Sequence, residues 1–297
     1  MAMISEDTYR KYWERKFRGL LIFLLDQSGS MLQEVEVGGK TYTNGAIATA
    51  ALNDLIYNIT NNIQADDVTG QLKDYCDILV LGYGDQVLPL LDNGRTTPIS
   101  ISELMANPKG HTQVQVGRMV QGRVIQVQEN RPYWVAPVIG SKRTEMAMAL
   151  QYAYEAIRNW LAVDKARERS FPPIVVNITD GDHNGVGNPV TEANHIREQV
   201  TVDGHVLLFN CHLTSHGRQR IVFPQRLETI QKQITDADER EWATQLFTMS
   251  SIIPRTIIRR ARNLYHVTLE DEARGFIYNA SPGDLMNFLR WGTQPNG

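Results

Sequence analysis

LLIFLLDQSGSM, residues 20–31, is an apolar run that ends abruptly in oxygen-bearing side chains. The uninterrupted run Leu20–Leu25 is typical of a parallel strand that is buried on both faces of a sheet. Asp26 follows it directly, and the hydroxyl side chains of Ser28 and Ser30 come next at alternate positions. The stretch therefore predicts a buried parallel sheet with a polar site where its first strand ends.

Strands and helices alternate along the rest of the chain. Further strands are predicted at Ile78–Leu81, Asp85–Leu91 (an antiparallel edge), Ile174–Ile178, His205–Leu213 and Gly275–Tyr278. Helices are predicted at Asn44–Gln64, Thr144–Leu161, Thr191–Val200, Gln225–Ala237, Pro254–Asn263 and Pro282–Leu289. This alternation predicts an α/β fold: a doubly wound, mostly parallel, Rossmann-like sheet with helices on both faces.

The regular pattern breaks between Asp92 and Lys142, a proline- and glycine-containing stretch that we interpret as a small β-rich insertion. Alternating residues at Val114–Val116 and Val124–Val127 predict a hairpin within it. The main domain is assigned to residues 17–293. Residues 1–16 are interpreted as an N-terminal helical extension, because the charged segment Glu6–Arg18 is typical of a short helix, and residues 294–297 as a tail.

Composition excludes several classes of protein. With 297 residues, 42% of them hydrophobic, the chain can bury a large core, which excludes a disordered chain. A net charge of −3 argues against a protein that mainly coats nucleic acid. No apolar run approaches the roughly 20 residues that span a bilayer. Cys76 and Cys211 form no disulfide framework, so we expect free thiols and a cytoplasmic location.

Two further loops offer oxygen ligands at the same predicted edge of the sheet. Asp180 follows the strand Ile174–Ile178, and Thr144 opens the helix Thr144–Leu161. A set made only of carboxylates and hydroxyls suits a hard cation such as Mg²⁺, with Mn²⁺ or Ca²⁺ as alternatives. Taken singly, Thr144 could instead be a helix N-cap and Asp180 a turn former.

These residues resemble the metal-ion-dependent adhesion site (MIDAS) of the von Willebrand factor A (vWA) family. That site consists of Asp-x-Ser-x-Ser, a distant Thr and a distant Asp in Thr-Asp-Gly. The matching residues here are Asp26, Ser28, Ser30, Thr144 and Asp180. The resemblance implies that the hydroxyls bind the metal directly, with Thr144 joining in the partner-bound state, and that both aspartates act largely through water. One coordination position would then be open to an Asp or Glu of a partner protein.

Other stretches resemble a bacterial vWA subfamily found near kinases and phosphatases in signalling or stress and defence operons. They are Trp134 with Pro137, Phe171–Gly181, Asp203–Asn210, Leu246–Ser251 and Ala273–Ala280. The resemblance implies a cytoplasmic protein-interaction module in such a system, associated with a kinase or phosphatase.

An enzyme is the least favoured class. Phosphatases that attack through a strand-end aspartate carry a second Asp two residues later, where this chain has Ser28, and no phosphate-binding glycine loop with its lysine is present. We therefore predict a metal-dependent protein-binding module. Two alternatives stay open: a scaffold whose partners bind independently of metal, and an RNA-binding vWA protein that uses the arginines at 255, 259, 260 and 262.

Overall fold

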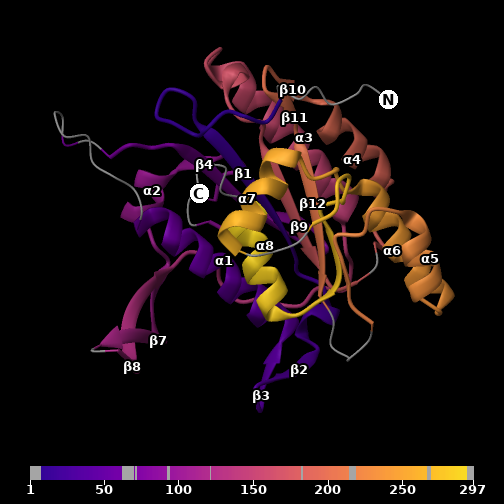
Figure 1. Ribbon diagram of the computed structural model, residues 1–297, viewed down its shortest axis with the longest axis horizontal. Helices are drawn as coiled ribbons and strands as arrows, with labels where there is room; N and C mark the ends of the chain where they lie inside the picture. The colour runs from indigo at the N-terminus through magenta and orange to yellow at the C-terminus, as the bar shows by residue number, and fades with distance from the viewer. Residues whose placement is uncertain are drawn as a thin grey trace.

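The computed structural model describes residues 8–61, 70, 72–91, 94–120, 122–181, 183–213, 219–265 and 269–292. Over these ranges the central feature is an eight-stranded sheet with helices packed on both sides (Figure 1). Its parallel strands, in spatial order, are β14 (Phe276–Ala280), β12 (Leu207–Leu213), β9 (Ile174–Thr179), β1 (Gly19–Asp26) and β4 (Cys76–Tyr83). Antiparallel strands flank them: β13 (Ile221–Val222) beside β14, and β5 (Val87–Pro89) and β6 (Ile99–Ser100) beside β4.

The strand order identifies the winding. From β1 the chain proceeds outward to β4 and β5, then returns to the other side of β1 with β9 and continues to β12 and β14. This is the order of a doubly wound sheet, so the predicted fold class is confirmed. The direction of winding reverses between β1 and β9, and ligands of such sheets bind beyond the carboxyl ends of the strands at this point. Asp26 and Asp180 are located there.

Alternate residues of β1 pack into two separate cores, which is why its apolar run has no polar interruption. Leu21, Phe23 and Leu25 belong to one core, and Leu20, Ile22 and Leu24 belong to the other. The first core is covered by α1 (Asn44–Asn61), α2 (Ile101–Ala106), α7 (Arg255–Tyr265) and α8 (Pro282–Gly292). The second is covered by α3 (Met146–Val163), α4 (Pro189–Glu198), α5 (Leu227–Gln233) and α6 (Ala237–Met249).

The predicted N-terminal helix is wrong where the structure describes it, because residues 8–18 form bends and irregular chain without a helix. Tyr9 has a left-handed φ of 57° and donates its N–H to the carbonyl of Asp203 at 2.6 Å. The Asp203 carboxylate accepts the next two N–H groups, those of Arg10 (3.1 Å) and Lys11 (3.0 Å). These bonds to a distant turn override the local preference for helix. Residues 1–7, like the predicted tail at 294–297, lie outside the described ranges.

Several features of the main domain were not predicted, among them the short edge strand β13, helix α6 and the hairpin after β1. Helix α6 begins in a charged segment, where Asp236 caps it by accepting the N–H of Glu239 at 3.0 Å, yet it buries Trp242 and Phe247. A small hairpin of β2 (Glu34–Val37) and β3 (Lys40–Thr43) follows the end of β1.

The insertion contains the predicted hairpin, which is longer than expected. Strands β7 (Gly110–Val120) and β8 (Arg123–Tyr133) pair along their whole length and project away from the sheet (Figure 1). Trp134, at the foot of the hairpin, is buried in the core against α2 and donates to the carbonyl of Leu104 at 2.7 Å. The insertion is thus anchored in the main core while its hairpin extends outward.

Helices long and apolar enough to cross a membrane are absent from the described part of the chain. Cys76 and Cys211 are both free and buried.

Candidate metal site

The site begins at the carboxylate of Asp26, the last residue of β1, which is fully buried. One carboxylate oxygen accepts the backbone N–H of Ser28 at 2.8 Å, and the other accepts the hydroxyl of Thr179 at 2.6 Å. Thr179 is the last residue of β9, the neighbouring strand. Hydrogen bonds therefore hold both carboxylate oxygens of Asp26 at the point where the winding of the sheet reverses and β1 and β9 end side by side.

A line of polar contacts leads from this loop to Asp180. The hydroxyls of Ser28 and Ser30 lie 2.9 Å apart, and Ser30 donates to one oxygen of Asp180 at 2.7 Å. The other oxygen of Asp180 accepts the side-chain amide of Asn44, the first residue of α1, at 3.0 Å. Gly181 lies beside this line, and a Cβ there would come within 3.1 Å of the Ser30 hydroxyl. Four of the five predicted ligands thus lie in one connected cluster.

In the part of the chain that the structure describes, no cationic side chain balances the negative charge of the cluster. Among the described residues, no lysine, arginine or histidine forms an ion pair with Asp26 or Asp180. Burial raises the pKa of Asp26 to about 6, and the charge of Asp180 adds to this rise despite hydrogen bonds from Thr179 and Ser28. Burial likewise raises the pKa of Asp180 above its usual value. A fully buried and a partly buried carboxylate, side by side, are costly unless a cation neutralises them.

Thr144 belongs to a third loop, which backbone bonds attach to the first. Ser141 donates its N–H to the carbonyl of Gln27 at 2.7 Å, and the N–H of Gly29 donates to the carbonyl of Ser141 at 2.8 Å. Gly84 makes room for this loop, because a Cβ there would lie 1.9 Å from the Ser141 hydroxyl. The loop is therefore held against the residues that carry Ser28 and Ser30.

The backbone of Thr144 also contacts the Asp180 loop. Its N–H donates to the side chain of Asn184 at 2.8 Å, and its carbonyl lies 2.8 Å from Nδ1 of His183. Thr144 is buried, and the interpretation of it as a helix N-cap is wrong, because the N-cap of α3 is Glu145. The structure thus joins all three predicted loops, with Thr144 tied to the cluster through its backbone.

Sequence reasoning missed the residues that orient the aspartates. Thr179 lies next to Asp180 in the quoted Thr-Asp-Gly motif, so its position signalled that its hydroxyl would lie near the site. Asn44 gave no signal, because nothing in its neighbourhood shows that the start of α1 meets a loop 136 residues away.

The donor set fits a hard divalent cation. Carboxylate and hydroxyl oxygens are the ligands that Mg²⁺, Mn²⁺ and Ca²⁺ accept, whereas sites for softer metals use thiolate or imidazole. Groups of three or more His, Cys, Asp or Glu side chains able to hold a metal are absent from the described residues. A cation at this site would therefore depend on its serine and threonine hydroxyls, together with the two aspartates.

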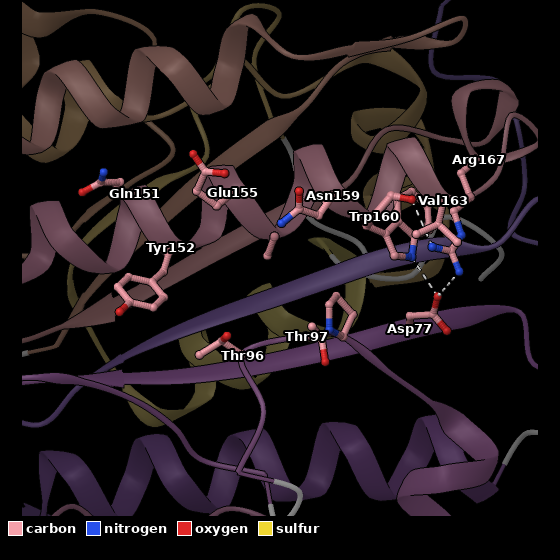
Figure 2. A pocket seen from close by; sticks show the side chains of 12 residues that line it. Asp77, Thr96, Thr97, Gln151, Tyr152, Glu155, Asn159, Trp160, Val163 and Arg167 are labelled. Atoms are coloured by element: carbon pink, nitrogen blue, oxygen red, sulfur yellow. Dashed lines mark hydrogen bonds and ion pairs between the residues drawn. The ribbon is translucent and has the colours of Figure 1, made fainter.

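A cleft of about 510 Å³ lies elsewhere, between α3 and residues 96–98 (Figure 2). Asp77 in its wall accepts the indole N–H of Trp160 at 2.8 Å and lies 3.5 Å from the guanidinium of Arg167. The charge of Asp77 is therefore balanced, unlike that of Asp26. None of the five predicted ligands lines this cleft.

A scan against protein-family models found no match, and a search of curated proteins found no significantly similar sequence. Solved structures do align with the chain. A structure of proximal thread matrix protein 1 from the mussel byssus, described as having a zinc-occupied MIDAS motif, aligns over 92% of this chain and 46% of its own, with 12% identity and a TM-score of 0.46. This chain thus spans about half the length of that protein.

Two further solved structures align over less of the chain. A von Willebrand factor type A protein from Catenulispora acidiphila aligns over 79% of this chain and 44% of its own, with 10% identity and a TM-score of 0.37. The manganese-loaded TRAP protein of Plasmodium vivax aligns over 66% of this chain and 57% of its own, with 15% identity and a TM-score of 0.31. The fold assignment above rests on the strand order of this chain and not on these superpositions.

Proposed function

We propose that this chain is a vWA-type domain that binds a divalent cation, Mg²⁺ in the first place, and through it an acidic side chain of a partner protein. The observation that carries the proposal is a pair of carboxylates, the fully buried Asp26 and the partly buried Asp180, which lie in one cluster with the hydroxyls of Ser28 and Ser30. Neither carboxylate has a cationic partner among the residues that the structure describes. Such an arrangement is unfavourable without a cation and favourable with one.

Each residue has a definable part in the proposed site. Ser28, Ser30 and Thr144 would hold the cation through hydroxyl oxygens, while Asp26 and Asp180 would hold those hydroxyls and the intervening water in place. When bound, the cation supplies an open coordination position for a carboxylate of the partner. We propose that the role is binding rather than catalysis.

Titration calorimetry with Mg²⁺ and Mn²⁺ tests the metal site. The wild-type protein is expected to give saturable heat, and Asp26→Ala is expected to give none while keeping its circular dichroism spectrum. Asp164→Ala is the matched control, because it removes an exposed aspartate outside the cluster. Equal heats from wild type and Asp26→Ala would disprove the site.

Chelation tests the docking role. Proteins that copurify with the chain from its native cells should be lost in EDTA and recovered when Mg²⁺ is restored. Copurification that persists in EDTA would favour the scaffold alternative, in which partners bind independently of metal.

We also propose a cytoplasmic setting in a bacterial signalling or stress and defence system, beside a kinase or phosphatase. Its support is the resemblance of Phe171–Gly181 and the related stretches to that subfamily, together with two buried free thiols. The functions encoded by the neighbouring genes test this part of the proposal, and a neighbourhood without kinase, phosphatase or defence genes would contradict it.

A further inference from the structure

Two arginines meet near the end of the sheet opposite the proposed metal site. Arg197 lies in the last turn of α4, and Arg274 directly precedes the glycine that leads into β14. Both donate to one acceptor, the carbonyl of Ser250, which caps the carboxyl end of α6: Arg274 at 2.6 Å and Arg197 at 3.3 Å. The next residue, Ser251, bonds to Leu208 near the start of β12, so the pair lies toward the amino ends of the strands.

Within the described ranges, no carboxylate pairs with this arginine pair to neutralise its charge. Neither arginine forms an ion pair with a carboxylate in the part of the chain that the structure describes. Glu198 is near enough for its charge to act on Arg197, but burial and the charge of Arg274 together lower the pKa of Arg197. Burial alone lowers the pKa of Arg274. Two like charges are thus held together at a partly buried position.

Donor capacity is also left over. Arg197 uses its two terminal nitrogens on the carbonyl of Ser250 and the side chain of Asn194, while its Nε is buried with no hydrogen-bond acceptor. A buried guanidinium N–H without an acceptor is unfavourable. Two arginines are not needed to cap the carboxyl end of a helix. At the end of α5, Arg240 alone donates to the carbonyls of Ile234 and Thr235.

We propose that Arg197 and Arg274 form a binding site for a phosphate-type oxyanion. Two guanidinium groups carry two positive charges, and a phosphate group carries close to two negative charges at neutral pH. Phosphate oxygens also match the paired N–H groups of arginine, which bind them in a bidentate manner. Both arginines are only partly buried, so a phosphate group on the surface of the protein can reach their terminal nitrogens, each of which carries a second N–H group, although it cannot reach the buried Nε of Arg197.

Titration with inorganic phosphate tests this site independently of the metal site. Isothermal titration is performed in EDTA at constant ionic strength, so that no cation at Asp26 can bind phosphate. The wild-type protein is expected to give saturable heat, and Arg274→Gln and Arg197→Gln are each expected to bind phosphate about tenfold or more weakly, as the loss of a charge-assisted contact implies. Arg240→Gln is the matched control and should bind as the wild type does.

Folding of each variant is checked by circular dichroism. If a glutamine variant does not fold, Arg274→Lys is tested in its place. Lysine keeps the positive charge but cannot make the bidentate contact, so Arg274→Lys should also bind phosphate more weakly than the wild type. Absence of saturable heat from the wild-type protein would overturn the proposal, and so would glutamine variants that bind phosphate as the wild type does.

The same titration distinguishes the source of the phosphate group. Tighter binding of a phosphoserine peptide than of inorganic phosphate assigns the site to a phosphorylated partner. The reverse order assigns it to free phosphate. Either order supports the site, provided that the glutamine variants weaken the binding.

Discussion

The Asp26 carboxylate accepts hydrogen bonds from Ser28 and Thr179, and burial raises its pKa to about 6. At neutral pH it is therefore a buried charge that opposes folding of the metal-free protein. Asparagine can replace it without losing contacts: its amide would donate to Thr179, whose hydroxyl would then donate to the carbonyl of Gly181, now 3.1 Å away. We predict that Asp26→Asn stabilises the metal-free protein at pH 7 by about 1–3 kcal/mol and abolishes stabilisation by Mg²⁺.

The pH dependence of unfolding checks this prediction. Because the pKa of Asp26 in the folded protein lies above its ordinary value of 3.8, the folded state binds a proton more tightly than the unfolded chain. In EDTA the wild-type protein should gain stability as the pH falls from 7 through 6 toward 4, and Asp26→Asn should gain less, because the contribution of Asp26 is removed while that of Asp180, whose pKa is also raised, remains. Thermal melts of both proteins measure it, and parallel pH profiles would contradict the prediction.

Thr144 separates the two steps of the proposed function. Its backbone is fixed by Asn184 and His183, so shortening its side chain leaves the loop in place. We predict that Thr144→Ala weakens partner binding about tenfold or more and changes metal affinity less, because its hydroxyl joins the cation mainly when the partner is bound. Calorimetry with Mg²⁺ and pull-downs with the partner measure the two effects, and an equal loss in both would contradict this order.

The five candidate ligands could be proposed from sequence because they lie at or shortly after the ends of β1 and β9, or shortly before α3, and the apolar residues of these elements define their ends. The residues that orient them could not all be predicted in this way. Asn44 contacts Asp180 only because α1 starts beside the end of β9, and no local pattern encodes that approach.

At the scale of elements, apolar periodicity predicted helices such as α1 and α3 and failed where tertiary contacts or charges dominate. Helix α6 begins with acidic residues, so the apolar side that it buries is not evident from the start of its sequence. The N-terminal segment has a charge pattern typical of a helix, but its backbone N–H groups bond to Asp203 instead. The sequence of that segment contains no sign of a partner almost two hundred residues away.

The N-terminal segment supplies a prediction at this scale. The Asp203 carboxylate holds the N–H groups of Arg10 and Lys11, so Asp203→Ala should leave both without an acceptor. We predict a loss of about 2 kcal/mol in unfolding free energy and faster hydrogen exchange confined to residues 8–18. Asp203→Asn, which keeps one acceptor oxygen, should fall between alanine and wild type. Unchanged exchange in Asp203→Ala would show that other contacts, such as the buried Trp13, suffice.

At the scale of the whole molecule, alternation of strands and helices predicted the doubly wound class, but the spatial order of the strands emerged only from the structure. That order places β1 beside β9 and so brings together carboxylates 154 residues apart in sequence. It also places the arginine pair toward the other end of the same strands. The sheet therefore separates a cluster of negative charge from a cluster of positive charge.

This separation leads to a prediction for the entire fold. A cation that binds only the folded state stabilises it by mass action, by about 2.7 kcal/mol when its concentration is a hundred times its Kd. For a chain of this length that corresponds to a rise in Tm of about 4 °C.

Mg²⁺ should therefore raise the Tm of the wild-type protein, and EDTA should reverse the rise. Asp26→Ala should melt at the same temperature in both conditions, whereas Arg274→Gln should retain the full response to Mg²⁺, because the arginine pair lies outside the metal site. A Mg²⁺ response that survives in Asp26→Ala would place the cation somewhere other than the end of β1.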